Sequence, residues 1–207
     1  MRARAKMILI GSLLVCGGLP VFSATVAENI KALKATDPAA RRQAVEDLVK
    51  AGPDALPELL AAATNRRLLV ISTIVGRMGR PAVPKLIKLL KDPKLYASAG
   101  TMLTQVINPD SRAQIPALLS CLKDPVLQHY CGQSLVRTVD AKSQGRVQDI
   151  AAVLKSTDKV ARMYASTALG MIGRKAKDAE PALEAAAKDA DPDVRREAAE
   201  ALKKIRT

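Results

Sequence analysis

Few residues of this chain are of a type and spacing that could do chemistry. His129 is the only histidine, and a metal site needs further Cys, His or carboxylate ligands clustered around it, which this sequence does not offer. There is also no Gly-x-Ser-x-Gly turn and no glycine loop of the kind that binds phosphates. We therefore expect no catalytic residue, no bound metal and no cofactor, and we predict that the protein is not an enzyme.

Positive charge is the chemical feature that the sequence has in excess. The chain contains 33 Lys and Arg and 20 Asp and Glu, which gives a net charge of +13. Lys85, Lys88 and Lys91 recur at intervals of three, so that they share one side of a helix. Such a stripe attracts acidic peptides, phosphates or anionic glycans, or it simply keeps a helical surface in solution. With the nearby arginines, the candidate partner-binding residues are Arg66, Arg67, Arg77, Arg80, Lys85, Lys88 and Lys91.

The elements that must position these residues repeat along the chain. An apolar and usually small residue is followed four positions later by a larger apolar residue, in the pairs Ala44/Leu48, Ile71/Val75, Ala99/Leu103, Cys131/Leu135, Ala165/Leu169 and Ala198/Leu202. Successive pairs lie 27 to 34 residues apart. A period of this size is typical of a solenoid built from two-helix units.

Polar residues, glycines and prolines mark where each unit begins and turns. An Asp followed by Pro is expected to cap the first helix at Asp37, Asp92, Asp124 and Asp191. Glycine is expected to end that helix in a left-handed conformation at Gly52, Gly79 and Gly173, with Asn108 and Asp140 in the same role in the middle units. A proline then opens most second helices, at Pro57, Pro84, Pro116 and Pro181.

The succession Asp-Pro-x-Val-Arg, Ala-x-x-Ala-Leu, Gly and Pro-x-Leu-x-x-x-Leu resembles the HEAT repeat, and most closely the bacterial subtype of phycobilisome-lyase-like proteins. The clearest copy spans residues 158–187, and the resemblance covers residues 28–207. It implies an all-α solenoid of about five two-helix units, with an incomplete leading unit at 26–36 and a capping helix at 192–206. It also implies that the second helices line a concave face, which would place the three lysines in a groove.

Two further groups of residues have a structural interpretation in this repeat frame. Arg41, Arg162 and Arg195 share one column, and we expect them to form ion pairs between adjacent units. Cys131 stands in the column of small buried residues, and its distance from the turn at Asp124 differs from that of Cys121. The pattern therefore favours two buried thiols, and a disulfide between Cys121 and Cys131 is the alternative in an oxidising compartment.

The first 27 residues have the layout of a secretory signal peptide. Basic residues precede an apolar run at residues 7–15, and small residues follow a glycine and proline break. Cleavage after Ala27 satisfies the preference for small residues better than cleavage after Ala24, and it leaves 28–207 with a net charge of +10. Lipidation at Cys16, or retention of this segment as an uncleaved anchor, are the alternatives.

Taken together, these features predict an exported scaffold of the bacterial cell envelope, periplasmic or secreted and monomeric. We expect it to bind an acidic protein partner along a basic concave face. Aromatic residues make up only 2% of the chain, which disfavours nucleic acid as a partner, and we expect membrane attachment only through an uncleaved or lipidated N-terminus. The alternatives are a bilin-lyase-like enzyme, which an export signal disfavours, and a protein that binds anionic lipid or glycan.

Overall fold

The fold is an all-α solenoid, seen in a computed structural model that describes residues 24–64 and 67–207. The first helices of its five units are α2 (Pro38–Ala51), α4 (Leu68–Met78), α6 (Tyr96–Val106), α8 (Gln128–Thr138) and α10 (Lys159–Ile172). The second helices are α3 (Leu56–Ala61), α5 (Val83–Leu89), α7 (Ile115–Cys121), α9 (Val147–Val153) and α11 (Glu180–Ala186). Helix α1 (Val26–Ala32) precedes the first unit and α12 (Pro192–Arg206) follows the last. The predicted architecture is confirmed, including the incomplete leading unit and the closing helix.

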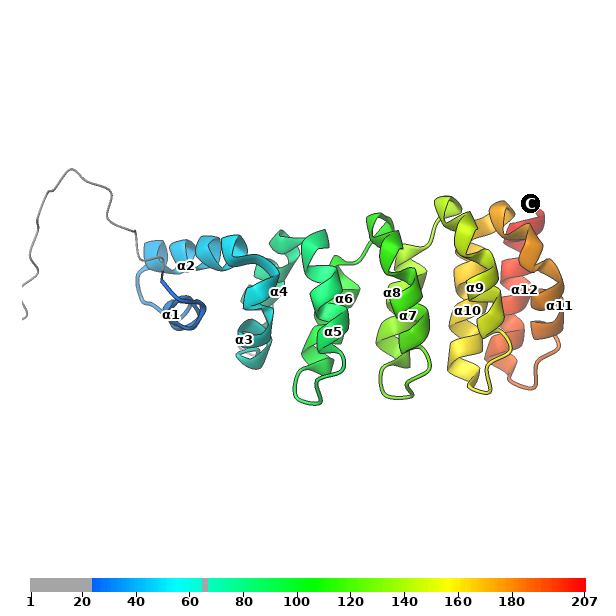
Figure 1. Cartoon of the computed structure of the whole chain (residues 1–207), viewed down its shortest axis with the longest axis horizontal. Helices are drawn as coiled ribbons and strands as arrows, with labels where there is room; N and C mark the ends of the chain where they lie inside the picture. The colour runs from blue at the N-terminus through cyan, green and yellow to red at the C-terminus, as the bar shows by residue number, and fades with distance from the viewer. Residues whose placement is uncertain (1–23, 65–66) are drawn as a thin grey trace, which may run out of the picture.

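The units follow one another along the long axis of the molecule (Figure 1). The first helices pack in succession, from α2 through α4, α6, α8 and α10 to α12, and they form one layer. In the second layer, α1 packs on α3, α3 on α5, and α7 on α9. The molecule therefore has two long edges. At one edge each first helix turns into its second helix, and at the other each second helix leads into the next unit.

The core lies between the two layers and is built from the residues that defined the repeat. Leu48, Val75, Leu103, Leu135 and Leu169 are all fully buried. The small residues of the paired column are also buried, so that adjacent first helices approach closely at Ala99 and Ala165. Burial of one such leucine contributes about 2 kcal/mol, and each unit repeats this contribution against its neighbours.

Each first helix is joined to its second helix by a 3-10 helix, where the chain reverses direction. Some units make this turn with a glycine, and the middle units make it without one. Gly52, Gly79 and Gly173 have φ of 67°, 62° and 67°. Their ψ values, between −142° and −152°, place them outside the predicted left-handed helical region, in a region open essentially only to glycine. The connecting 3-10 helices are η1 (Gly52–Ala55), η2 (Arg80–Ala82), η3 (Pro109–Gln114), η4 (Ala141–Arg146) and η5 (Gly173–Ala179).

The middle units use a different device from the predicted one. Asn108 and Asp140 have φ of −154° and −150°, so the prediction that they replace the glycine was wrong. Each instead caps the following 3-10 helix, with its side chain accepting from the backbone N–H two residues later, in Asp110 and Lys142. A side-chain acceptor thus satisfies the backbone where no glycine permits a positive φ.

The turn at the other edge also has two forms. Asp37, Asp158 and Asp191 cap first helices directly, each accepting from two backbone N–H groups. Asp92 and Asp124 accept instead from Lys94 and Val126, within a turn that precedes α6 and α8. The prediction that these two residues cap the helices directly was wrong. They stabilise a tighter turn that comes before each helix begins.

Most of the predicted signal peptide, Cys16 included, lies outside the described residues. Thr25 caps α1: its hydroxyl accepts from the Glu28 backbone N–H at 3.3 Å, and the Glu28 carboxylate accepts from the Thr25 N–H at 2.8 Å. Cleavage after Ala27 would remove this cap, whereas cleavage after Ala24 would preserve it. In 24–64 and 67–207, no helix has both the length and the apolar character needed to cross a membrane.

Candidate functional site

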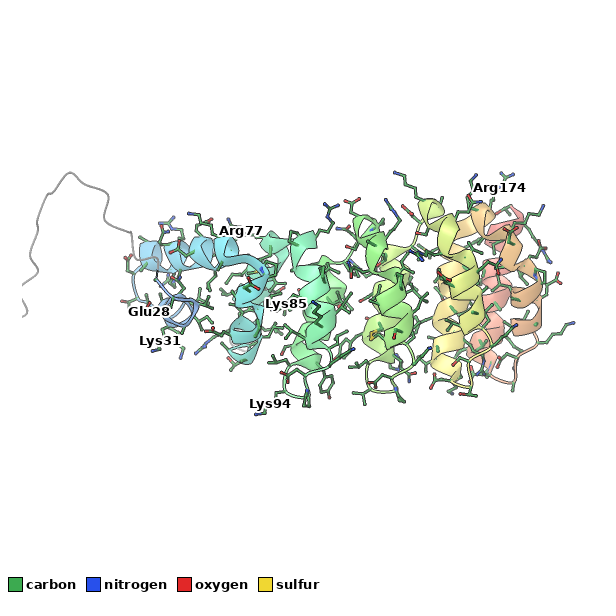
Figure 2. The ribbon with its side chains drawn as sticks, in the orientation of Figure 1. Glu28, Lys31, Arg77, Lys85, Lys94 and Arg174 are labelled. Atoms are coloured by element: carbon green, nitrogen blue, oxygen red, sulfur yellow. A yellow bond between two sulfur atoms is a disulfide. The ribbon has the colours of Figure 1, made fainter. Side chains whose placement is uncertain are left out.

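The seven basic residues predicted to bind a partner are divided among different parts of the solenoid. Arg66 lies outside the described residues, and Arg67 is the half-buried residue just before α4. Arg77 and Arg80 lie at the edge where first helices turn into second helices, opposite the turn that carries Lys91. In Figure 2, Arg77 is near one long edge and Lys94, which follows Lys91, is at the other.

Arg77 is already occupied by a partner within the chain. Its two terminal nitrogens donate to the two carboxylate oxygens of Glu46 on α2, at 2.8 and 2.7 Å. These hydrogen bonds raise the pKa of Arg77 and lower the pKa of Glu46. Both side chains are nearly half exposed, so the pair links two units without contributing much stability. Arg77 is therefore a connector within the first layer.

Lys85, Lys88 and Lys91 do follow one another along α5 and its end, as predicted. Lys88 and Lys91 are exposed, and Lys85 is half-buried with its ammonium 3.7 Å from a carboxylate oxygen of Asp54. Asp54 lies in the connection of the preceding unit and is itself exposed. The stripe is thus a solvent-facing feature of the second layer, and within the described part of the chain its charge is compensated at Lys85 alone.

A longer row of lysines, which the sequence interpretation missed, runs through the position of Lys91. Five of the six second-layer helices are followed by a lysine whose backbone N–H bonds to the carbonyl three residues before it. All five are exposed, and within the described residues none of them forms an ion pair. We call these residues the lysine row: Lys34, Lys91, Lys123, Lys155 and Lys188.

The lysine row occupies one edge of the solenoid because every second helix ends there. A lysine at a helix C-terminus also interacts favourably with the free carbonyls, which stabilises each helix end. The sequence signal was the Lys-Asp step that opens several turns, as at Lys91-Asp92 and Lys123-Asp124.

The arginine column has a capping role that the sequence did not predict. Arg41, Arg162 and Arg195 each donate to two carbonyls of the turn that precedes their own helix. Among the described residues, Arg162 alone also forms the predicted pair between units, donating to Asp189 at 2.7 and 2.8 Å. This hydrogen bonding lowers the pKa of Asp189. The column holds these turns in place.

Cys121 and Cys131 form a disulfide, so the interpretation as two separate thiols was wrong. The bond joins the last residue of α7 to the first turn of α8, with the Cα atoms 5.9 Å apart. The turn at Asp124 is short enough to bring these helix ends together without shifting one helix along the other. Cys131 is nonetheless fully buried, as its column predicted. The bridge fixes the turn that carries Lys123.

A pocket of about 780 Å³ lies between the second helices α7 and α9. Its apolar lining includes Pro116 and Leu119 from α7 and Val153 from α9. Two members of the lysine row, Lys123 and Lys155, also line it. The pocket therefore combines an apolar surface with positive charge at its border.

The described residues show no arrangement of metal ligands. No group of three His, Cys, Asp or Glu side chains is clustered in residues 24–64 and 67–207. His129 is exposed and stands edge-on to Tyr164, with the ring centroids 6.1 Å apart.

Comparisons with known proteins agree with this architecture. The family of HEAT repeats matches residues 147–207. No curated protein matches the chain. An engineered protein of the Northeast Structural Genomics Consortium is 19% identical, with a TM-score of 0.51, over 87% of this chain and 96% of its own. A second engineered protein of that consortium has the same identity and TM-score, and the match covers 88% of this chain and 48% of that one.

A designed armadillo repeat protein in complex with the peptide (KR)4 is 14% identical, with a TM-score of 0.48, over 88% of this chain and all of its own. At these identities the likeness concerns the fold alone. Such repeat folds are usually non-catalytic scaffolds, and their extended surfaces are compatible with protein binding. The repeated units, the two helical layers and the family match over 147–207 agree: the chain has the fold of a HEAT-like repeat protein.

Proposed function

We propose that this protein is a non-catalytic scaffold that binds an acidic protein segment along its second-helix layer. The observation that carries the proposal is the lysine row, in which exposed ammonium groups, unpaired among the described residues, recur at one structural position after five of the six second-layer helices. A regular array of like charges attracts an extended anionic partner better than a small one, because several weak attractions act at once. Lys88 lies beside this row on α5 and extends it.

The acidic residues of the same edge do not cancel this attraction. Asp92 and Asp124 direct carboxylate oxygens to backbone N–H groups in their turns, and Asp158 does the same at the start of α10. Their charge is therefore partly balanced by amide dipoles. Lys91 and Lys123 form no ion pair with any other described residue and are exposed, so a partner carboxylate can reach their ammonium groups.

We also propose that the protein is exported, with residues 1–27 acting as its signal. Support comes from the Cys121–Cys131 disulfide, because structural disulfides form and persist in oxidising compartments such as the periplasm. The intact mass of the protein purified from its native host tests this proposal. A chain that begins at Thr25 or Glu28 would support cleavage, a lipid-modified Cys16 would support anchoring, and an unprocessed chain in the cytoplasm would contradict export.

Crosslinking in intact cells of the native host, followed by mass spectrometry, tests the binding function. The row variant replaces Lys91, Lys123 and Lys155 with Glu. The matched control replaces Lys142, Lys175 and Lys177 with Glu, and these lysines are exposed at the opposite edge. Both variants therefore change the net charge by the same amount.

We expect the wild type and the control to crosslink to the same acidic protein, and the row variant to lose it. Equal loss in both variants would mean that net charge alone attracts partners, which would contradict a defined surface. Crosslinks that survive in the row variant would place the binding surface elsewhere. Transfer of the crosslinks from protein to lipid would favour anionic lipid as the partner.

A further inference from the structure

We infer that the pocket between α7 and α9 receives an apolar side chain of the acidic partner, while carboxylates beside that side chain meet Lys123 and Lys155. This inference rests on the proposed function and adds a sequence preference to it. The partner segment would carry an apolar residue flanked by Asp or Glu. The pocket would then determine which acidic segment binds, and the lysine row would supply attraction common to all of them.

The floor of the pocket is suited to an aliphatic side chain. Leu119 and Val153 keep some exposed surface there, and Leu122 closes the base. Ala152 is exposed at the border, where its small side chain leaves the entrance open. A pocket of about 780 Å³ has room for a leucine or phenylalanine side chain and part of the adjoining backbone.

The charges around the pocket are complementary to an acidic partner. Two acids line it, but both are engaged within the chain: Asp149 accepts from Arg146 at 3.2 Å, and Asp158 caps α10 by accepting from two backbone N–H groups. Lys123 and Lys155 are exposed and form no ion pair among the described residues. The positive groups are thus the ones free to interact.

Asp158 has a further neighbour that holds its carboxylate. With the side-chain amide of Gln128 oriented so that both its polar atoms find partners, its nitrogen donates to the two Asp158 oxygens at 2.9 and 3.2 Å. Gln128 is buried on α8, so this contact also joins the units on either side of the turn. An incoming carboxylate would therefore face less repulsion from Asp158 than from a carboxylate without these donors.

The disulfide prepares this pocket for binding. Cys121 is two residues from Lys123 and precedes Leu122, which lines the pocket base. The bond to Cys131 restricts the turn between α7 and α8, so little conformational freedom remains to be lost when a partner binds. Among the sites found, this is the one where an apolar floor, free cations and a covalently fixed turn coincide.

Two other hollows lack this combination. One, of about 730 Å³ near the C-terminus, is lined mainly by charged side chains such as Arg174 and Lys175, without an apolar floor. The other, of about 440 Å³ between α2 and α4, includes Arg77, whose charge is already matched by Glu46. Neither contains a lysine of the row. A further hollow, of about 460 Å³, includes Lys34 of the row beside Leu33 and Val70, but the disulfide lies elsewhere in the chain.

Binding of three fluorescent peptides to the full chain, measured by anisotropy, tests the inference. The probes are eleven glutamates, the same peptide with leucine at its centre, and eleven lysines with that central leucine. We expect the leucine-containing acidic peptide to bind about tenfold more tightly than the glutamate peptide, because partial burial of a leucine is worth about a factor of ten. The lysine peptide should not bind.

The matched variants are Ala152→Trp, which fills the pocket, and Ala185→Trp, at the equivalent exposed position of α11. Neither substitution changes charge, and both sites are exposed, so circular dichroism and melting temperature should match the wild type. We expect Ala152→Trp to abolish the tenfold advantage of leucine while leaving the binding of the glutamate peptide intact. Ala185→Trp should preserve the advantage.

The possible failures are distinct. If the leucine peptide binds no more tightly than the glutamate peptide, or keeps its advantage in Ala152→Trp, the pocket is not the receptor for an apolar side chain. If Ala185→Trp loses the advantage as well, the effect does not belong to the α7/α9 pocket. If neither acidic peptide binds better than the lysine peptide, the proposed function itself is wrong.

Discussion

The ring of Tyr164 on α10 lies over Gly132 on α8, in the space that a Cβ atom at position 132 would occupy. Tyr130 stands in the same relation to Gly100, one unit earlier. Adjacent first helices therefore meet through an aromatic ring on one side and a bare backbone on the other. Glycine serves here to admit the ring of the next unit, although it weakens the helix that contains it.

We predict that Gly132→Ala destabilises the protein by about 1–3 kcal/mol, because the added methyl group must displace a partly buried ring that packs against the core. Gly76→Ala is the matched control: Gly76 also lies within a first helix, but no atom comes within 4 Å of an added Cβ. That change should stabilise the protein by about 0.5–1 kcal/mol, as alanine is the better helix former. Urea unfolding of both variants measures the difference, and equal effects would contradict the ring contact.

The Arg162–Asp189 pair should contribute measurably to stability. Both side chains are largely buried, at 15% and 12% exposure, and the contact has two hydrogen bonds. Asp189→Asn should therefore reduce the free energy of unfolding at pH 7 by about 1.5–3 kcal/mol. Glu46→Gln, in the exposed pair with Arg77, is the comparison and should lower the free energy of unfolding less than Asp189→Asn does. A smaller effect at Asp189 than at Glu46 would overturn this ranking.

The same pair predicts a pH dependence. Hydrogen bonds from Arg162 lower the pKa of Asp189 below its ordinary value of 3.8, so the folded state binds that proton less readily than the unfolded state. The stabilisation is therefore complete above the ordinary value and is lost as pH falls through the lower folded value. Melting curves of wild type and Asp189→Asn should differ by a constant amount down to about pH 4 and converge below it. A difference that vanished already near neutral pH would contradict this origin.

The disulfide should stabilise the chain by about 3 kcal/mol, since it closes a loop between residues 10 apart and restricts the unfolded state. Chemical denaturation with and without reductant measures this contribution. In a variant with Cys121→Ala and Cys131→Ala, reductant should have no effect; alanine fits the buried position because Ala99 and Ala165 fill the same column. An unchanged midpoint on reduction of the wild type would show that the bond contributes nothing.

Salt should separate the two components of peptide binding. Binding of the glutamate peptide to the lysine row is electrostatic and should weaken steadily between about 0.05 and 0.5 M NaCl as the charges are screened. The additional affinity from the central leucine comes from apolar burial and should remain near tenfold across that range. Anisotropy titrations at several salt concentrations give both values. A leucine advantage that fell in parallel with the electrostatic component would argue against burial.

The repeat frame was predictable because its signal is periodic and apolar. The pairing of Ala165 with Leu169 reports a buried helix face directly, and the structure buries both residues completely. The polar turns were harder. Asn108 accepts hydrogen bonds in several backbone conformations, so its residue type did not reveal which helix end it satisfies.

The surface was less predictable than the frame. Aligning the units on their apolar pairs superposes the first helices, on which those pairs lie. Because the units differ in length, the ends of the second helices do not fall at equivalent positions in that alignment. Lys91 was therefore grouped with Lys85 on its own helix, and its relation to Lys123 and Lys155 appeared only in three dimensions. The cysteine pair was misjudged for a related reason: distance from a turn along the sequence is a poor measure when the turn itself is compact.

The disulfide also has a mechanical consequence, because it links the unit that contains α7 to the unit that contains α8 and α9. In a solenoid, each unit contacts only its neighbours, so a stretching force applied to the two ends acts on every junction between units in turn. Within the described residues, this junction is the one with a covalent crosslink, so stretching would separate other units first. The two walls of the α7/α9 pocket would stay together while other units of the solenoid separated, and a bound segment would remain in the pocket under the stretching force.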